Sequence, residues 1–187
     1  MNNTLAGKNI AILVANGFDE NQMTEIQRAL LKEKANIKTI APEQGVVNGW
    51  QGNGWGHYFP VDGQIGETLG SDFDMLVLPG GERATAKLKG NLHTRRIINH
   101  FMEANKPIAA IGAGTGLIAL TGKLSGVVMT GSADVQDELK AAEAVIGQDP
   151  IEICDNLLTA EGSDIVAWVE QTIAFFSETA AEVSAAA

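Results

Sequence analysis

Four short segments rich in apolar residues, each followed by a turn, constrain the fold of this chain more than any other feature. They lie at residues 8–15, 37–41, 74–78 and 107–111. Apolar runs of this length are typical of strands that are buried on both faces of a parallel sheet. Between the first two, Met23, Ile26 and Leu30 follow helical spacing, which makes a β-α-β unit. The sequence therefore predicts an α/β fold with a mostly parallel central sheet.

The rest of the chain extends this alternation with one interruption. We expect a helix from about Leu92, a short helix after Gly112, and a final amphipathic helix capped by Ser163-Asp164. Further strands are predicted at 127–130, 151–153 and 157–159, the last two as a short β pair. Residues 43–70 contain eight glycines and little periodicity, so we expect a long loop or a hairpin with short strands near 46–47 and 58–61.

The length of 187 residues fits a single domain over residues 1–187. We expect an ordered core from about residue 6 to residue 177 and a frayed tail over 178–187, where alanine predominates.

Charge and cysteine content exclude several classes of function. With 13 basic against 23 acidic residues, the net charge of −10 disfavours nucleic acid and anionic membranes as partners. The first residues lack a signal peptide's apolar core and no run is long enough to span a membrane, so a cytoplasmic location is expected. Cys154 is the single cysteine, which rules out an internal disulfide and a Cys/His metal cluster. We expect no metal, no cofactor and an inert thiol.

The turn at Ile111-Gly112-Ala113-Gly114 is where chemistry is expected. Ligands of open α/β sheets gather at the carboxyl ends of strands, and a sharp strand-to-helix turn presents its apical side chain there. Gly112 carries no thiol or hydroxyl, and Thr115 lies one turn further on. The chain is therefore not expected to be a cysteine or serine hydrolase.

Three segments in order resemble the ThiJ/PfpI family of the class I glutamine amidotransferase-like superfamily. They are L-V-L-P-G-G at 76–81, K-P-I-A-A-I-G-A-G at 106–114 and D-N-L-L-T-A at 155–160. The likeness runs from about Lys8 to Phe176, and the sequence is similar also to the C-terminal domain of large-subunit catalases. The resemblance implies a flavodoxin-like three-layer sandwich, a stress-related context, and self-association as a homodimer or higher homo-oligomer.

The same resemblance locates a site that has lost its reactive groups. Active family members carry Cys-His or Cys-Ala at the positions of Gly112 and Ala113. The family's supporting carboxylate falls on Asp19 or Glu20, which the sequence leaves open. Backbone N–H groups that bind the oxyanion in the family map to Gly81 and Ala113, with Gly114 opening the helix behind them.

Two functions of different class follow from this pattern. The first is a non-catalytic module, with a regulatory, structural or binding role, whose vestigial pocket holds a small anion, carboxylate or water. The second is a cysteine-independent enzyme of glyoxalase, hydratase or hydrolase type, which uses Asp19 or Glu20 as general base on a small carbonyl compound.

The remaining candidates have structural interpretations beside functional ones. His57, Tyr58 and Thr115 are possible pocket walls, whereas the neighbouring Trp50, Trp55 and Phe59 could instead form a core or a subunit interface. Gly112-x-Gly114-x-Gly116 with Asp134 suggests dinucleotide binding only weakly, because Leu117 occupies the third glycine position of that fingerprint.

Overall fold

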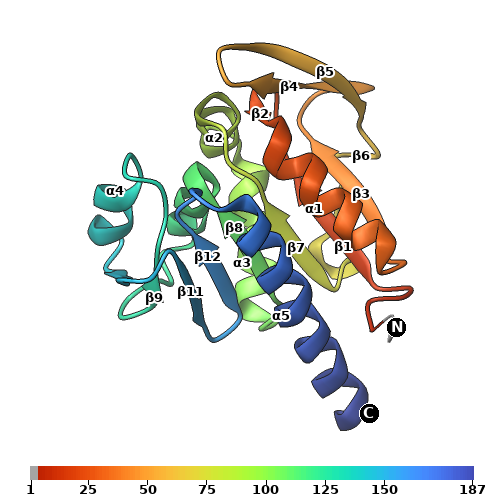
Figure 1. Cartoon of the computed structure of the whole chain (residues 1–187), viewed down its shortest axis with the longest axis vertical. Helices are drawn as coiled ribbons and strands as arrows, with labels where there is room; N and C mark the ends of the chain where they lie inside the picture. The colour runs from red at the N-terminus through yellow and green to blue at the C-terminus, as the bar shows by residue number, and fades with distance from the viewer. Residues whose placement is uncertain (1–3) are drawn as a thin grey trace.

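The computed structural model describes residues 4–187 and is built around a seven-stranded sheet (Figure 1). Its strand order is β11-β12-β8-β7-β1-β3-β6. The five inner strands are mutually parallel, in the order β12 (Leu157–Ala160), β8 (Ile108–Ile111), β7 (Met75–Leu78), β1 (Asn9–Leu13) and β3 (Asn36–Ala41). β11 (Ile151–Cys154) adds an antiparallel edge, and β6 (Gly63–Gln64) closes the other edge. The predicted α/β class and mostly parallel sheet are confirmed.

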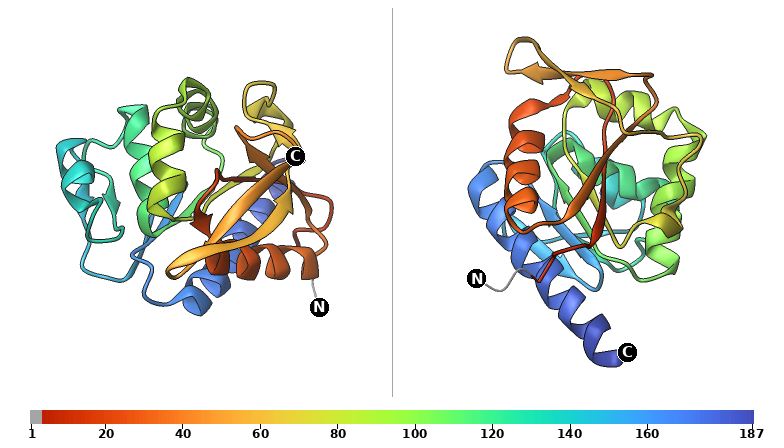
Figure 2. Two further views of the ribbon diagram at one scale, coloured as in Figure 1. Left: turned by 90° about the horizontal axis from the view of Figure 1, so that it is seen from above. Right: turned by 90° about the vertical axis from the view of Figure 1, so that its right-hand side faces the viewer.

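Helices cover both faces of this sheet, which makes three layers (Figure 2). α1 (Glu20–Lys32) and α5 (Ile165–Ala186) pack side by side on one face. α2 (Glu82–Lys89), α3 (Leu92–Glu103) and the 3₁₀ helix η2 (Gly112–Thr121) lie on the other face. All four residues of β7 and of β8 are buried, as expected for strands covered on both sides.

A second, three-stranded sheet stands at one end of the molecule (Figure 1). It consists of β2 (Phe18–Asp19), β4 (Val46–Gln51) and β5 (Gly54–Pro60), so the glycine-rich segment forms a longer hairpin than its composition suggested. The hairpin register shifts between Asn48 and Trp50, where Gly49 faces two residues of β5. This β-bulge bends the hairpin over the start of α1.

Several elements differ from the sequence-based expectations. The strand near 127–130 becomes β9 (Val128–Met129), which pairs with β10 (Val145–Ile146) outside the main sheet. Neither α2, α4 (Gln136–Ala141) nor the 3₁₀ turn η1 (Gly70–Asp72) was expected, because each is short and has few apolar residues. The expected frayed tail is helical to Ala186, since alanine and glutamate favour helix.

Residues 1–3 lie outside the described part of the chain. They make up most of the segment on which the expectation of no signal peptide was based. Within residues 4–187, no helix combines the length and the apolar character needed to cross a membrane.

Candidate functional site

The turn after β8 has the geometry of a nucleophile turn without the nucleophile. Gly112 has φ +59°, a left-handed conformation that glycine adopts at little cost. Two residues on, Gly114 packs against the end of β7, where a β-carbon would lie only 2.4 Å from the Leu78 carbonyl oxygen. The Gly80 loop approaches from the same side, because a β-carbon on Gly80 would lie 3.3 Å from the Ala113 nitrogen. Two glycine loops therefore meet backbone to backbone at the carboxyl ends of β7 and β8.

The side chain that faces residue 112 is the neutral amide of Gln22. A β-carbon on Gly112 would lie 3.5 Å from Gln22 Nε2, at ordinary contact distance. The other side-chain atom, Oε1, accepts a 2.7 Å hydrogen bond from the Gly80 N–H, which fixes the orientation of the amide. Within residues 4–187, Nε2 donates to no hydrogen bond. The turn therefore faces an oriented donor that lacks a partner in the described chain.

Neither carboxylate that the sequence suggested for this position occupies it. Asp19 is the N-cap of α1, and its Oδ1 accepts a 3.0 Å hydrogen bond from the Gln22 N–H. Glu20 is only 5% exposed and turns toward the hairpin. Asp19 and Glu20 are thus bonded elsewhere, and the side chain nearest residue 112 is that of Gln22, three residues after the N-cap, which points back over the helix start.

Gln22 has a sequence signal that was overlooked. An N-cap residue followed three positions later by Glu or Gln is the capping-box pattern, and Asp19 and Gln22 match it. In this chain the Gln reaches the Gly80 N–H of a different loop instead of the N-cap backbone. The pattern marks the residue, but only the fold shows what it contacts.

The other predicted site residues divide between the turn and elsewhere. Thr115 is fully buried and its hydroxyl donates to the Gly112 carbonyl oxygen at 2.9 Å, so it closes the turn from within. Gly81 caps α2 with φ +111° and fits against the loop after β1, where a β-carbon would lie 2.6 Å from the Gly17 carbonyl oxygen. Gly162 lies against the turn, since a β-carbon there would lie 3.5 Å from the Gly112 Cα.

His57 and Tyr58 lie on β5 and are not brought to the turn. The His57 side chain is 77% exposed and the residue Tyr58 is 70% exposed, and the groups nearest a β-carbon on Gly112 are Gln22 and the Glu161 carbonyl. Trp50 is held between Trp55 and the Arg83 guanidinium, which lies 3.8 Å from its ring centre. Phe59 packs edge-on against Phe18. These aromatic residues thus pack along the hairpin, Trp50 and Trp55 near its tip and Phe59 near its base.

Glu20 forms the ionisable cluster that the sequence did not anticipate. Its carboxylate fills the β-bulge: Oε2 accepts from the His57 backbone N–H at 2.8 Å, and Oε1 accepts from Gln51 Nε2 at 2.8 Å. His57 Nδ1 lies 2.5 Å from Oε1. Burial opposes ionisation, but the hydrogen bonds from His57 and Gln51 and the charge of His57 outweigh it, so the pKa of Glu20 lies below its usual value. An ionised Glu20 requires Nδ1 of His57 to carry a proton.

Two further predictions concern residues outside the turn. Cys154 is half-buried on the edge strand β11, and Asp134 is exposed. In the described part of the chain, no group of three His, Cys, Asp or Glu side chains is arranged to hold a metal ion.

Comparison with known proteins agrees with this architecture. The model of the DJ-1/PfpI family matches residues 8–174. General stress protein 18 of Bacillus subtilis is 28% identical over 175 residues, which are 92% of this chain and 99% of that protein. Deglycase TK1284 of Thermococcus kodakarensis is 26% identical over 165 residues, covering 88% of this chain and 96% of that protein. The crystal structure of a ThiJ/PfpI domain protein from Brachyspira murdochii superposes with a TM-score of 0.83 at 18% identity, covering 92% of this chain and 98% of that one.

Proposed function

The chain belongs to the DJ-1/PfpI family, and from this membership we propose that it is a non-catalytic member that holds a small anion or carboxylate at the Gly112 turn. Its relatives include a protein named for stress and a protein named as a deglycase, so family membership alone does not decide between binding and catalysis. In this proposal the chain keeps the family's binding geometry at the turn and lacks the family's catalytic chemistry.

One observation carries the proposal: the side chain beside Gly112 is a neutral amide with a free donor. Gln22 Nε2 points to the position where a β-carbon of residue 112 would stand, and its Oε1 is occupied by the Gly80 N–H. A carboxylate in this place would repel an anion, whereas an amide N–H attracts one. Gly112 and Ala113 are the first two residues of η2, and the first N–H groups of a helix lack partners within it.

The hydrogen bonds of Asp19 and Glu20 disfavour the alternative, a cysteine-independent enzyme that uses either residue as base. A general base must reach the proton that it removes. Asp19 caps α1, and every side-chain hydrogen bond of Glu20 goes to the hairpin. We therefore favour the binding function.

The first test is methylglyoxal consumption by wild type, Cys154→Ala, Gly112→Cys and the double variant Gly112→Cys/Gln22→Glu. We expect no turnover by wild type or Cys154→Ala, because neither has an activated nucleophile at the turn. The double variant restores both a thiol and a carboxylate, so it is the one expected to gain activity. Turnover by both wild type and Cys154→Ala would show that the chain is an enzyme and overturn the proposal.

The second test measures binding of formate, the smallest carboxylate, by ligand-observed NMR. We expect Gln22→Glu to weaken formate binding at least about tenfold, since it replaces a donor by a negative charge. Gln27→Glu adds the same charge on the same helix, outside the site, and serves as the matched control. Absence of formate binding to wild type, or equal loss in both variants, would contradict an anion site at the turn.

We propose in addition that the chain self-associates as a homodimer or higher homo-oligomer in the cytoplasm. The hairpin supports association because Trp55 and Tyr58 are 56% and 70% exposed on it. Analytical ultracentrifugation tests this, and a monomer at high micromolar concentration would contradict it.

A further inference from the structure

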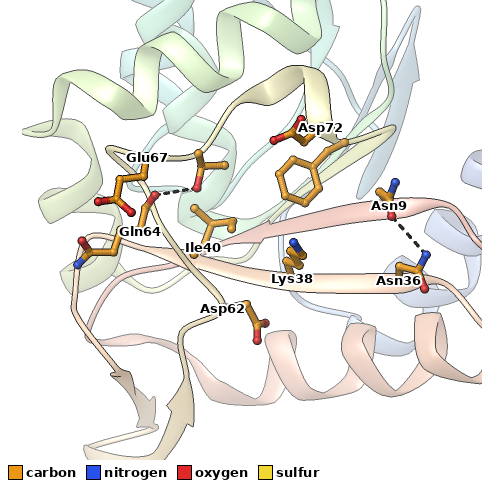
Figure 3. Close-up of a pocket in the computed structure, with 11 residues that line it drawn as sticks. Asn9, Asn36, Lys38, Ile40, Asp62, Gln64, Glu67 and Asp72 are labelled. Atoms are coloured by element: carbon orange, nitrogen blue, oxygen red, sulfur yellow. Dashed lines mark hydrogen bonds between the residues drawn. The ribbon is translucent and has the colours of Figure 1, made fainter.

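A cavity of about 310 Å³ lies at the outer edge of the main sheet, apart from the Gly112 turn (Figure 3). β3 forms its floor with Asn36, Lys38 and Ile40, whose alternation along the strand places them on one face. The chain from β6 to η1 arches over this floor and contributes Glu67 and Asp72. Phe73 adds a buried ring, so the cavity has an apolar patch beside its charges.

Lys38 is the cation of this cavity and rises from the floor (Figure 3). The ion pairs formed among residues 4–187 do not include Lys38, Glu67 or Asp72, so no carboxylate in that range lies within 4.0 Å of the Lys38 ammonium. The third acid of the lining, Asp62, has a structural role, since its Oδ2 accepts the Thr39 N–H at 2.7 Å and it points away from Lys38. Opposite charges thus share a cavity but remain separated across it.

We propose that this cavity binds a free α-amino acid in its zwitterionic form. Lys38 attracts the α-carboxylate, and Asp72 and Glu67 attract the α-ammonium from the arch above. A simple anion would be repelled by the two acids, and a simple cation would be repelled by Lys38. A ligand that carries both charges fits the arrangement, and Ile40 and Phe73 supply an apolar surface for its side chain.

This inference is independent of the proposed function, because none of the lining residues belongs to the Gly112 turn. The proposed ligand belongs to a second class. Its site is open and lined by charged side chains, whereas the side chain beside Gly112 is neutral. The failure of either binding proposal leaves the other standing.

The experiment compares three matched probes by ligand-observed NMR and titration calorimetry on the full chain. L-serine carries both charges, ethanolamine lacks the carboxylate, and 3-hydroxypropionate lacks the ammonium. We expect L-serine to bind at least about tenfold more tightly than either of the other two. Binding of ethanolamine or 3-hydroxypropionate as tight as that of L-serine, or no binding of L-serine at millimolar concentration, would overturn the proposal.

Variants of the floor and of the arch then locate the site. Lys38→Met keeps most of the aliphatic stem and removes the charge, and Asp72→Asn keeps the shape and removes the opposite charge. We expect Lys38→Met to weaken L-serine binding at least about tenfold, because it removes the charge that attracts the carboxylate. Asp72→Asn removes one of the two charges that attract the ammonium, so a smaller loss of L-serine affinity is expected. Lys32→Met, at the exposed end of α1, is the control and should bind like wild type. Unchanged L-serine affinity in Lys38→Met would overturn the proposal even if wild type binds.

Discussion

Glu20 and Gln22, two side chains in the first turn of α1, point to different parts of the molecule and have different roles. Glu20 turns toward the hairpin and is buried as a charge with three donors bonded to it. Gln22, two residues later, turns toward the Gly112 turn and offers an uncharged donor. In this chain the buried negative charge links the start of α1 to the hairpin, and the side chain beside the turn after β8 is neutral. An acidic residue near a strand end therefore indicates a catalytic role only when the direction of its side chain is known.

The space around the glycines also differs between the hairpin and the Gly112 turn. A β-carbon on Gly56 would lie 1.8 Å from Glu20 Oε2, and one on Gly49 would lie 2.6 Å from it, so the hairpin has no room around the carboxylate. At Gly112 a β-carbon meets nothing closer than 3.5 Å. The bulge is tightly packed around its charge, while the turn retains the space of a missing side chain.

Removing the buried carboxylate of Glu20 should destabilise the protein more than any other change considered. Glu20→Ala leaves the His57 backbone N–H and the Gln51 amide without their acceptor, and we expect it to lower the free energy of unfolding by about 3 kcal/mol. Gln22→Ala removes a single neutral hydrogen bond, so about 1–2 kcal/mol is expected. Urea unfolding followed by circular dichroism measures both. Equal losses would mean that the two regions are not distinguished by charge.

Alanine at Gly56 and at Gly112 tests how much space each region has for a β-carbon. Gly56→Ala forces the hairpin away from Glu20, and we expect a loss of about 2 kcal/mol. Gly112→Ala meets only the strain of φ +59°, so about 1 kcal/mol is expected. Gly52→Ala is the control for conformational strain alone, because it has φ +59° and open space around it. A greater loss at Gly112 than at Gly56 would contradict the idea of a retained space at the turn.

The pH dependence of the stability that Glu20 contributes is expected to be the least pronounced of these changes. Because the pKa of Glu20 is lowered in the folded state, its contribution to stability is complete above its usual value of about 4.5 and is lost as pH falls through the folded-state pKa. The stability difference between wild type and Glu20→Gln should therefore be constant from about pH 7 to about pH 5 and shrink below that range. Unfolding curves at several pH values test this, and a difference that grows on acidification would show the opposite shift.

Sequence patterns predicted the parallel core because each inner strand is buried on both faces and its apolar run is unambiguous. They also located the Gly112 turn, where the residue itself shows that no thiol or hydroxyl is present. Short elements such as α2 escaped notice, since Ala84 and Leu88 are its only buried apolar residues. The direction of Glu20 could not be predicted either, because it depends on the hairpin bulge at Gly49, which only pairing with β5 creates. The cavity under η1 likewise joins residues from β1, β3 and the arch that lie far apart in the chain.

The placement of α5 decides how this protein can be attached to another object. Its last turns extend away from the body at the end opposite the hairpin (Figure 1). A tag, a surface anchor or a fused protein joined after Ala187 would therefore stand clear of the hairpin and of the carboxyl ends of the parallel strands. Immobilised in this way, the protein would present the carboxyl ends of the parallel strands to the solution, which makes residue 187 the preferred point of attachment for a ligand-capture sensor.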